Sequence, residues 1–314
     1  MQPIKAAGAG LYSFSFKTFS MFELCTIGHI TLDKIQTLQS VKYMPGGTAY
    51  YFSKALKNFN IRHLLVTAVA KSEQYIIDEL RDEGLEIIGL PSHHTVYFEN
   101  IYPENTDYRE QNVLNTADPF TTGLMPPVNA KMFHLGPLLN TDITADLIKH
   151  LASKAIVSLD VQGLLRYTKN KKVLYKDLDD KENILKYITI LKANEFEMEV
   201  ITGTDDMHKG AKYLAKLGVK EVVITNGSKG SLIYSDDTFY SIPALIPTQM
   251  IDTTGCGDTY MAGYLYKKLR GAGIEECGYF GAAMATSKIQ SFGPFAGDVA
   301  SVERTLSAAS IQGM

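Results

Sequence analysis

Residues 252–258 read Asp-Thr-Thr-Gly-Cys-Gly-Asp, a short polar loop with two glycines. Met261, Leu265 and Leu269 then recur every four residues, which predicts a helix directly after the loop. The first N–H groups of a helix have no intrahelical partner, and the helix dipole favours negative charge at this end. The sequence therefore predicts a loop that leads into an anion-binding helix N-terminus.

The loop ends in a carboxylate, Asp258, although its glycines leave the backbone open to an anion. One interpretation is a general base that takes a proton from a substrate hydroxyl, while the N–H groups hold the phosphoryl group which that hydroxyl attacks. The alternative is structural: Asp258 caps the helix, and Gly255 and Gly257 only make the turn.

The complete seven-residue run resembles the signature of the ribokinase family (PfkB-type carbohydrate kinases), Asp-Thr-x-Gly-Ala-Gly-Asp, with Cys256 at the position of the usual small residue. In that family the last Asp is the catalytic base, and the Gly-x-Gly backbone forms the anion hole. The resemblance implies these roles for Asp258 and for Gly255, Cys256 and Gly257.

From Phe22 onwards, predicted strands and helices alternate, which favours an α/β fold with a largely parallel sheet and helices on both faces. The resemblance implies one ribokinase-like kinase domain over residues 21–314, a three-layer α/β/α structure with a small β lid. Residues 1–20 lack the apolar centre and cleavage site of a signal peptide. We expect them to be either a disordered extension or the product of a start codon that lies upstream of the native one.

The lid is expected from residues 33–45 and 93–114, where short runs alternate with period two. The resemblance implies that lid closure excludes water, and it implies a homodimer formed through the lid. Arg109 is either a contact to phosphate or substrate, or a solvated charge on the hairpin.

Gly46 and Gly47 open a second predicted helix, so backbone N–H groups are again exposed at a helix start. This resembles the family's N-terminal Gly-Gly motif, and Asp33 matches the family's substrate-binding Asp. Taken alone, Asp33 would suggest an ordinary turn residue just past the end of a strand. The family usually has Asn five residues after the first Gly, where this chain has Tyr51. Tyr51 either stacks on a less typical polyol or belongs to the core.

Asn194 and Glu197 begin another predicted helix, where an acidic first turn is ordinary dipole chemistry. They also match the family's Asn-x-x-Glu motif, which implies that they organise Mg²⁺ largely through water. Thr225, Gly227 and Gly230 match a Thr-x-Gly-x-x-Gly motif that lines the nucleotide, ATP, in the family. A hairpin turn explains the same residues, and the two interpretations are compatible.

Four further features of the sequence have their own interpretations. The loop 291–297 is expected near the nucleotide base, and the resemblance admits a monovalent-cation site beside it. Asp160 and Arg166 match the family's Asp-Pro-Asn and Arg only in part, and the basic run 169–172 suggests a solvated loop. His134 lies inside a predicted strand and is expected to be structural.

Composition limits the classes of function. The chain has 314 residues and a net charge of −3, which gives no electrostatic case for binding nucleic acid or an anionic membrane. Its three cysteines have no disulfide or zinc spacing, so we expect a cytoplasmic protein. No apolar run reaches the ~20 residues of a spanning helix. A Walker A motif is absent, as is a Gly-x-Gly-x-x-Gly after the first strand.

The sequence thus predicts an ATP- and Mg²⁺-dependent phosphotransferase that phosphorylates a hydroxyl of a sugar or related polyol, with Asp258 as the base. Two alternatives stay open. The acceptor could be a nucleoside or an inositol. The chain could also be a non-catalytic protein that binds sugar or nucleotide, although such a protein needs no base.

Overall fold

The computed structural model describes residues 21–101 and 110–311. The extension expected at 1–20 and the residue Arg109 lie outside these ranges. Within them, a nine-stranded sheet (sheet A) has the order β15-β14-β13-β12-β9-β8-β1-β4-β5, in which β13 to β5 are parallel and β14 and β15 are antiparallel. Its strands are β1 (Phe22–Ile27), β4 (His63–Ala70), β5 (Glu86–Ser92), β8 (Ala130–Leu135), β9 (Ile156–Asp160), β12 (Ile190–Asn194), β13 (Glu221–Thr225), β14 (Ser231–Ser235) and β15 (Thr238–Ile242).

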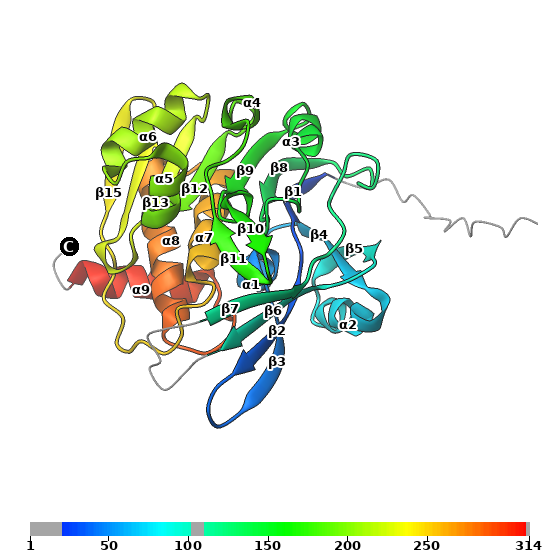
Figure 1. Ribbon diagram of the computed structural model, residues 1–314. Helices are drawn as coiled ribbons and strands as arrows, with labels where there is room; N and C mark the ends of the chain where they lie inside the picture. Colours follow the sequence, from blue (N-terminus) through cyan, green and yellow to red (C-terminus); the bar gives the residue numbers. More distant parts are fainter. Residues whose placement is uncertain (1–20, 102–109, 312–314) are drawn as a thin grey trace, which may run out of the picture.

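Helices cover both faces of sheet A (Figure 1). They are α1 (Thr48–Leu56), α2 (Gln74–Asp82), α3 (Ala145–Ala152), α4 (Lys181–Leu185), α5 (Glu195–Thr202), α6 (Met207–Lys216), α7 (Cys256–Leu269), α8 (Ile274–Ile289) and α9 (Val299–Ile311). Neighbouring strand residues point to opposite faces. Ile190 accordingly belongs to the buried apolar cluster that includes residues of α1, α7 and α8, and Leu191 to the cluster that includes residues of α3, α5 and α6. The three-layer α/β/α prediction is confirmed.

A second, six-stranded sheet (sheet B, the lid) has the order β10-β11-β7-β6-β2-β3. Its strands are β2 (Thr31–Gln36), β3 (Val41–Gly46), β6 (Val96–Ile101), β7 (Glu110–Asn115), β10 (Arg166–Lys169) and β11 (Lys172–Tyr175). Figure 1 shows β2, β3, β6 and β7 crossing the lower end of sheet A. The small β lid that the sequence predicts is therefore present.

The structure refines one local expectation and contradicts two others. The basic run 169–172 is exposed, as expected, but it forms the turn of the β10–β11 hairpin, where Asn170 and Lys171 have positive φ. Asp33 does not follow a strand but lies inside β2. The loop 252–258 is shorter than expected, because α7 already begins at Cys256. In the part of the chain that the structure describes, none of the helices has the length and apolar character to cross a membrane.

Candidate active site

Polar residues end three neighbouring strands of sheet A. Asp160 ends β9, Asn194 ends β12 and Thr225 ends β13, and Asn194 is directly opposite Thr225 in the register. The carboxyl ends of parallel strands form the edge at which open α/β sheets bind ligands. The site is therefore built along this edge.

The loop before α7 positions the N-terminus of that helix at the same edge. Gly255 is the N-cap residue with φ of +77°, and a Cβ there would lie 2.3 Å from the Tyr51 ring. Both observations require glycine. The Cys256 N–H donates to the Thr253 carbonyl at 3.2 Å. The first-turn N–H groups of Gly257 and Asp258 have no intrahelical acceptor, so they are the donors that this helix offers to an anion.

The Cys256 side chain has no sign of nucleophilic activation. Burial raises the pKa of its thiol to about 11. Its Sγ lies 3.9 Å from the carbonyl oxygens of Asp252 and Ala285. Cys256 therefore lines a cavity with a thiol that is not activated.

The environment of Asp258 suits a group that exchanges a proton near neutral pH. Its pKa is raised to about 7, mainly by burial and in addition by the neighbouring carboxylates Asp160 and Glu197. The Lys192 ammonium and a hydrogen bond with the Thr48 side chain act in the opposite direction. A carboxylate with such a pKa can hold a proton taken from a hydroxyl group.

Lys192 is a site residue that sequence reasoning missed. It lies on β12, is 4% exposed, and its Nζ is 3.0 Å from Asp160 Oδ2 and 3.7 Å from Glu197 Oε2. Burial alone would lower its pKa, but the carboxylates of Asp160, Glu197 and Asp258 raise it, so the side chain is an ammonium. A Cβ on Gly257 would lie 3.3 Å from Nζ, which puts the charge directly below the helix N-terminus. The available signal was a lysine in an apolar strand two residues before Asn194.

Two cavities meet at the loop. Thr253 lines both. Gly257 and Cys256 line one, of about 510 Å³, whereas Gly255 and Asp258 line the other, of about 700 Å³. Gly257 and Asp258, which are neighbours in the chain, therefore line two different cavities.

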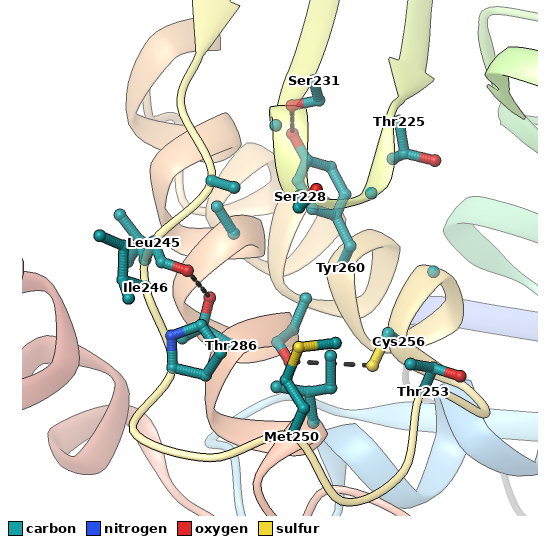
Figure 2. Close-up of a pocket in the computed structure, with 18 residues that line it drawn as sticks. Thr225, Ser228, Ser231, Leu245, Ile246, Met250, Thr253, Cys256, Tyr260 and Thr286 are labelled. Carbon is teal, nitrogen blue, oxygen red and sulfur yellow. Dashed lines mark hydrogen bonds between the residues drawn. The ribbon is translucent and has the colours of Figure 1, made fainter.

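The smaller cavity (the donor cavity) contains the three residues of the predicted nucleotide motif, Thr225, Gly227 and Gly230. Gly230 has φ of +91°, and a Cβ there would lie 2.1 Å from the Ile242 carbonyl oxygen. Figure 2 shows Leu245 and Ile246 on one side of this cavity and Thr225 on the other. The remaining lining is largely apolar, from the segment 244–250 and helices α7 and α8. Such a slot accepts a flat apolar group.

The larger cavity (the acceptor cavity) lies between the lid and the start of α1. Asp33, Gly47 and Tyr51 line it, and the Asp33 carboxylate is so close to Gly46 that a Cβ there would be 2.5 Å from Oδ2. The Tyr51 ring is 5% exposed and packs against Gly255, so it belongs to the core as well as to the cavity wall, and stacking on a polyol stays a prediction. Polar side chains complete the wall, namely Thr37, Asn100, Gln111, Gln162 and Arg166.

Asn194 and Glu197 form a capping box at the start of α5. Asn194 Oδ1 accepts the Glu197 N–H at 2.8 Å, and Glu197 Oε2 accepts the Asn194 N–H at 2.8 Å. In the described residues, no three His, Cys, Asp or Glu side chains are grouped to hold a metal ion. Mg²⁺ keeps several waters and needs few direct carboxylates, so a magnesium ion at these residues would be held mainly through water.

Comparison with known proteins gives three informative similarities. Residues 21–298 match the model of the "pfkB family carbohydrate kinase". A cytidine kinase of Thermococcus kodakarensis is 28% identical over 87% of this chain and 98% of its own length. A pyrophosphate-dependent kinase in the ribokinase family, solved with a pyrophosphate analogue and myo-inositol, is 28% identical, with a TM-score of 0.79 over 87% of this chain and 97% of its own.

A fold-level similarity extends to Arabidopsis thaliana ribokinase, solved with ribose and ATP. It has a TM-score of 0.76 at 20% identity, over 91% of this chain and 99% of its own.

Proposed function

The chain belongs to the pfkB family of carbohydrate kinases, and from this membership we propose that it transfers the γ-phosphoryl group of ATP, with Mg²⁺, to a hydroxyl of a sugar or related polyol. It is a phosphotransferase that acts on a hydroxyl group. The observation that supports the proposal best is the junction of the two cavities, where Asp258 faces the acceptor space and the Gly257 backbone faces the donor space.

In this mechanism Asp258 takes the proton of the acceptor hydroxyl. The hydroxyl oxygen forms a bond to the γ-phosphorus, the bond from that phosphorus to the bridging oxygen breaks, and ADP leaves. The free N–H groups at the start of α7, those of Gly257 and Asp258, stabilise the charge on the moving phosphoryl group, and Lys192 adds a positive charge below them. When bound, Mg²⁺ would neutralise phosphate charge, with Asn194 and Glu197 holding it through water.

ATP is the proposed donor, although a similar solved protein uses pyrophosphate. The donor cavity has about 510 Å³ of largely apolar space between Thr225 and α8. The adenosine part of ATP could occupy that space, whereas pyrophosphate would leave it to water. We therefore expect turnover with ATP to exceed turnover with pyrophosphate under matched conditions.

The acceptor is proposed as a ring that bears several hydroxyls, and Asp33, Gly46 and Gly47 would bind them. A nucleoside is a specific candidate because the acceptor cavity, about 700 Å³, has the aromatic rings of Phe98 and Phe292 in its lining, and Phe292 is 82% exposed. A base could stack on such a ring. The similarity to a cytidine kinase supports this candidate, and that to a kinase solved with myo-inositol supports an inositol.

The outer lid strand supports a homodimer. β3 is the edge of sheet B, and its residues Val41 and Tyr43 are both more than half exposed. An exposed apolar edge strand can pair with a second chain. We propose the lid as the contact between two copies.

The pH dependence of kcat/KM tests the role of Asp258. The base must be ionised to accept a proton, and burial raises its pKa to about 7. We therefore expect kcat/KM to fall tenfold per pH unit below about pH 7, with an apparent pKa near 7 in the free enzyme. An acid limb near the ordinary aspartate value of 4 would show that a different group, or none, titrates in this step.

Phosphoryl donor and acceptor are tested together. ADP or phosphate release is measured with Mg²⁺, with ATP or pyrophosphate, across pentoses, hexoses, sugar phosphates, nucleosides and inositols. One acceptor should raise release with ATP far above the rate without acceptor. If pyrophosphate supports the faster reaction, the donor proposal is wrong. If no member of the panel raises release although ATP binds, the choice of acceptor class is wrong.

A further inference from the structure

Lys288 is a fully buried cation in the last turn of α8. Its Nζ lies 2.8 Å from the main-chain carbonyl oxygen of Asp252 and 2.9 Å from Asp252 Oδ2. A buried ammonium is costly unless it is paired and hydrogen-bonded, and Asp252 supplies both a charge and a dipole. The lysine is therefore part of a built site and is not a surface charge.

Asp252 is the first residue of the loop that leads to α7, and it also joins that loop to the segment 291–297. Its Oδ1 accepts the Thr254 N–H at 2.9 Å, and its Oδ2 accepts the Gly293 N–H at 3.3 Å. The N–H groups of Ile251 and Asp252 donate to the Ile289 carbonyl at 2.8 and 3.2 Å. The position of the N–H groups at the start of α7 thus depends on the contacts of Asp252.

The family resemblance admits a monovalent-cation site beside the segment 291–297, and the residues present do not fit one. An alkali cation at this junction would need main-chain and carboxylate oxygens, and Asp252 offers one of each. Both already bind the Lys288 ammonium. A second cation on the same oxygens would lie close to a like charge that is shielded from water.

We propose that the Lys288 ammonium acts as a built-in monovalent cation that positions the loop 252–258, so that the enzyme needs no added potassium or sodium. Lys288 is a positioning residue, since it touches Asp252 and not the reacting atoms. The tests of this inference that measure turnover rest on the proposed kinase function. The tests that measure the response of Tm to cations do not.

The wild-type protein supplies the first test. Turnover and Tm are measured at constant ionic strength in choline, sodium, potassium and ammonium chlorides. Turnover should differ by less than about twofold, and Tm should not respond specifically to potassium, since a ligand that binds only the folded state would raise it. A requirement for potassium, or a saturable rise of Tm with potassium, would overturn the proposal.

The variant Lys288→Met is the second test. It keeps an apolar stem of similar shape but removes the ammonium, which leaves the Asp252 oxygens open to a small cation. In choline we expect kcat to fall about 10- to 100-fold, with recovery of most of it in potassium or ammonium, and a saturable rise of Tm in the same ions. Lys267→Met is the control. Lys267 lies in the last turn of α7, away from the loop, and pairs with Glu276 of α8. The control should show neither effect.

The two arms separate the possible failures. If Lys288→Met loses turnover equally in all salts and its Tm ignores potassium, the lysine is only structural and the proposal is wrong. If neither the wild type nor Lys288→Met phosphorylates any acceptor, the proposed kinase function is wrong. The Tm response of Lys288→Met to potassium still tests the cation site in that case. Should Lys288→Met not fold, Lys288→Gln and the wild-type salt series give the same decision.

Discussion

Replacing Asp258 with Asn is expected to lower kcat by about 10²- to 10⁴-fold while the binding of donor and acceptor is largely kept. The change removes the proton acceptor but keeps the shape of the side chain. Asp258 lines the acceptor cavity, and a pKa of about 7 suits it to proton transfer near neutral pH. Turnover is measured by acceptor-dependent ADP release, and binding by calorimetric titration of each ligand.

A second helix-start carboxylate provides the control. Asp206 is the N-cap of α6 and accepts the N–H groups of His208 and Lys209. Asp206→Asn should keep full turnover. If Asp258→Asn also keeps turnover and changes only Tm, then Asp258 is a helix cap and the proposed base is wrong.

Replacing Lys192 with Met should lower kcat/KM by about 10²- to 10³-fold, the range found when one preorganised charge-stabilising donor is removed. Its ammonium lies directly below Gly257 and lowers the pKa of Asp258. Without it, the acid limb of kcat/KM should therefore move to a higher pH than in the wild type. A purely structural lysine would not move that limb.

Stability and catalysis can be separated at the same position. Lys192→Met leaves Asp160 buried without its ion-pair partner, which should cost about 3–5 kcal/mol of unfolding free energy. The double variant Lys192→Met/Asp160→Asn should regain part of that stability, because the unpaired charge of Asp160 is gone, but should not regain turnover. Recovery of both in the double variant would mean that the lysine serves the fold alone.

The sequence predicted the parts of this site that are local. The loop 252–258, its helix and the Asn194–Glu197 pair depend on residues a few positions apart, and glycine spacing and capping chemistry describe such geometry directly. The alternation of strands and helices also predicted the parallel sheet, because crossover connections have few solutions.

Contacts between distant segments could not be predicted in this way. The Thr48 side chain forms a hydrogen bond with Asp258, which is far from it in the sequence. Lys288 contacts Asp252 only because α8 ends beside the loop. Lys192 lies in a strand whose pattern shows burial but not its carboxylate partners. The β10–β11 hairpin was missed because its basic composition resembles a solvated loop, while its pairing partner, β7, is far away in the chain.

The central claim is that the junction of the two cavities passes a phosphoryl group to an acceptor and not to water. It is tested most directly by measuring ADP and phosphorylated acceptor in one reaction, with the acceptor product identified by mass spectrometry. We predict one phosphorylated acceptor for each ADP, and little ADP when acceptor is omitted. ADP release that ignores the acceptor, with no phosphorylated product, would contradict the account.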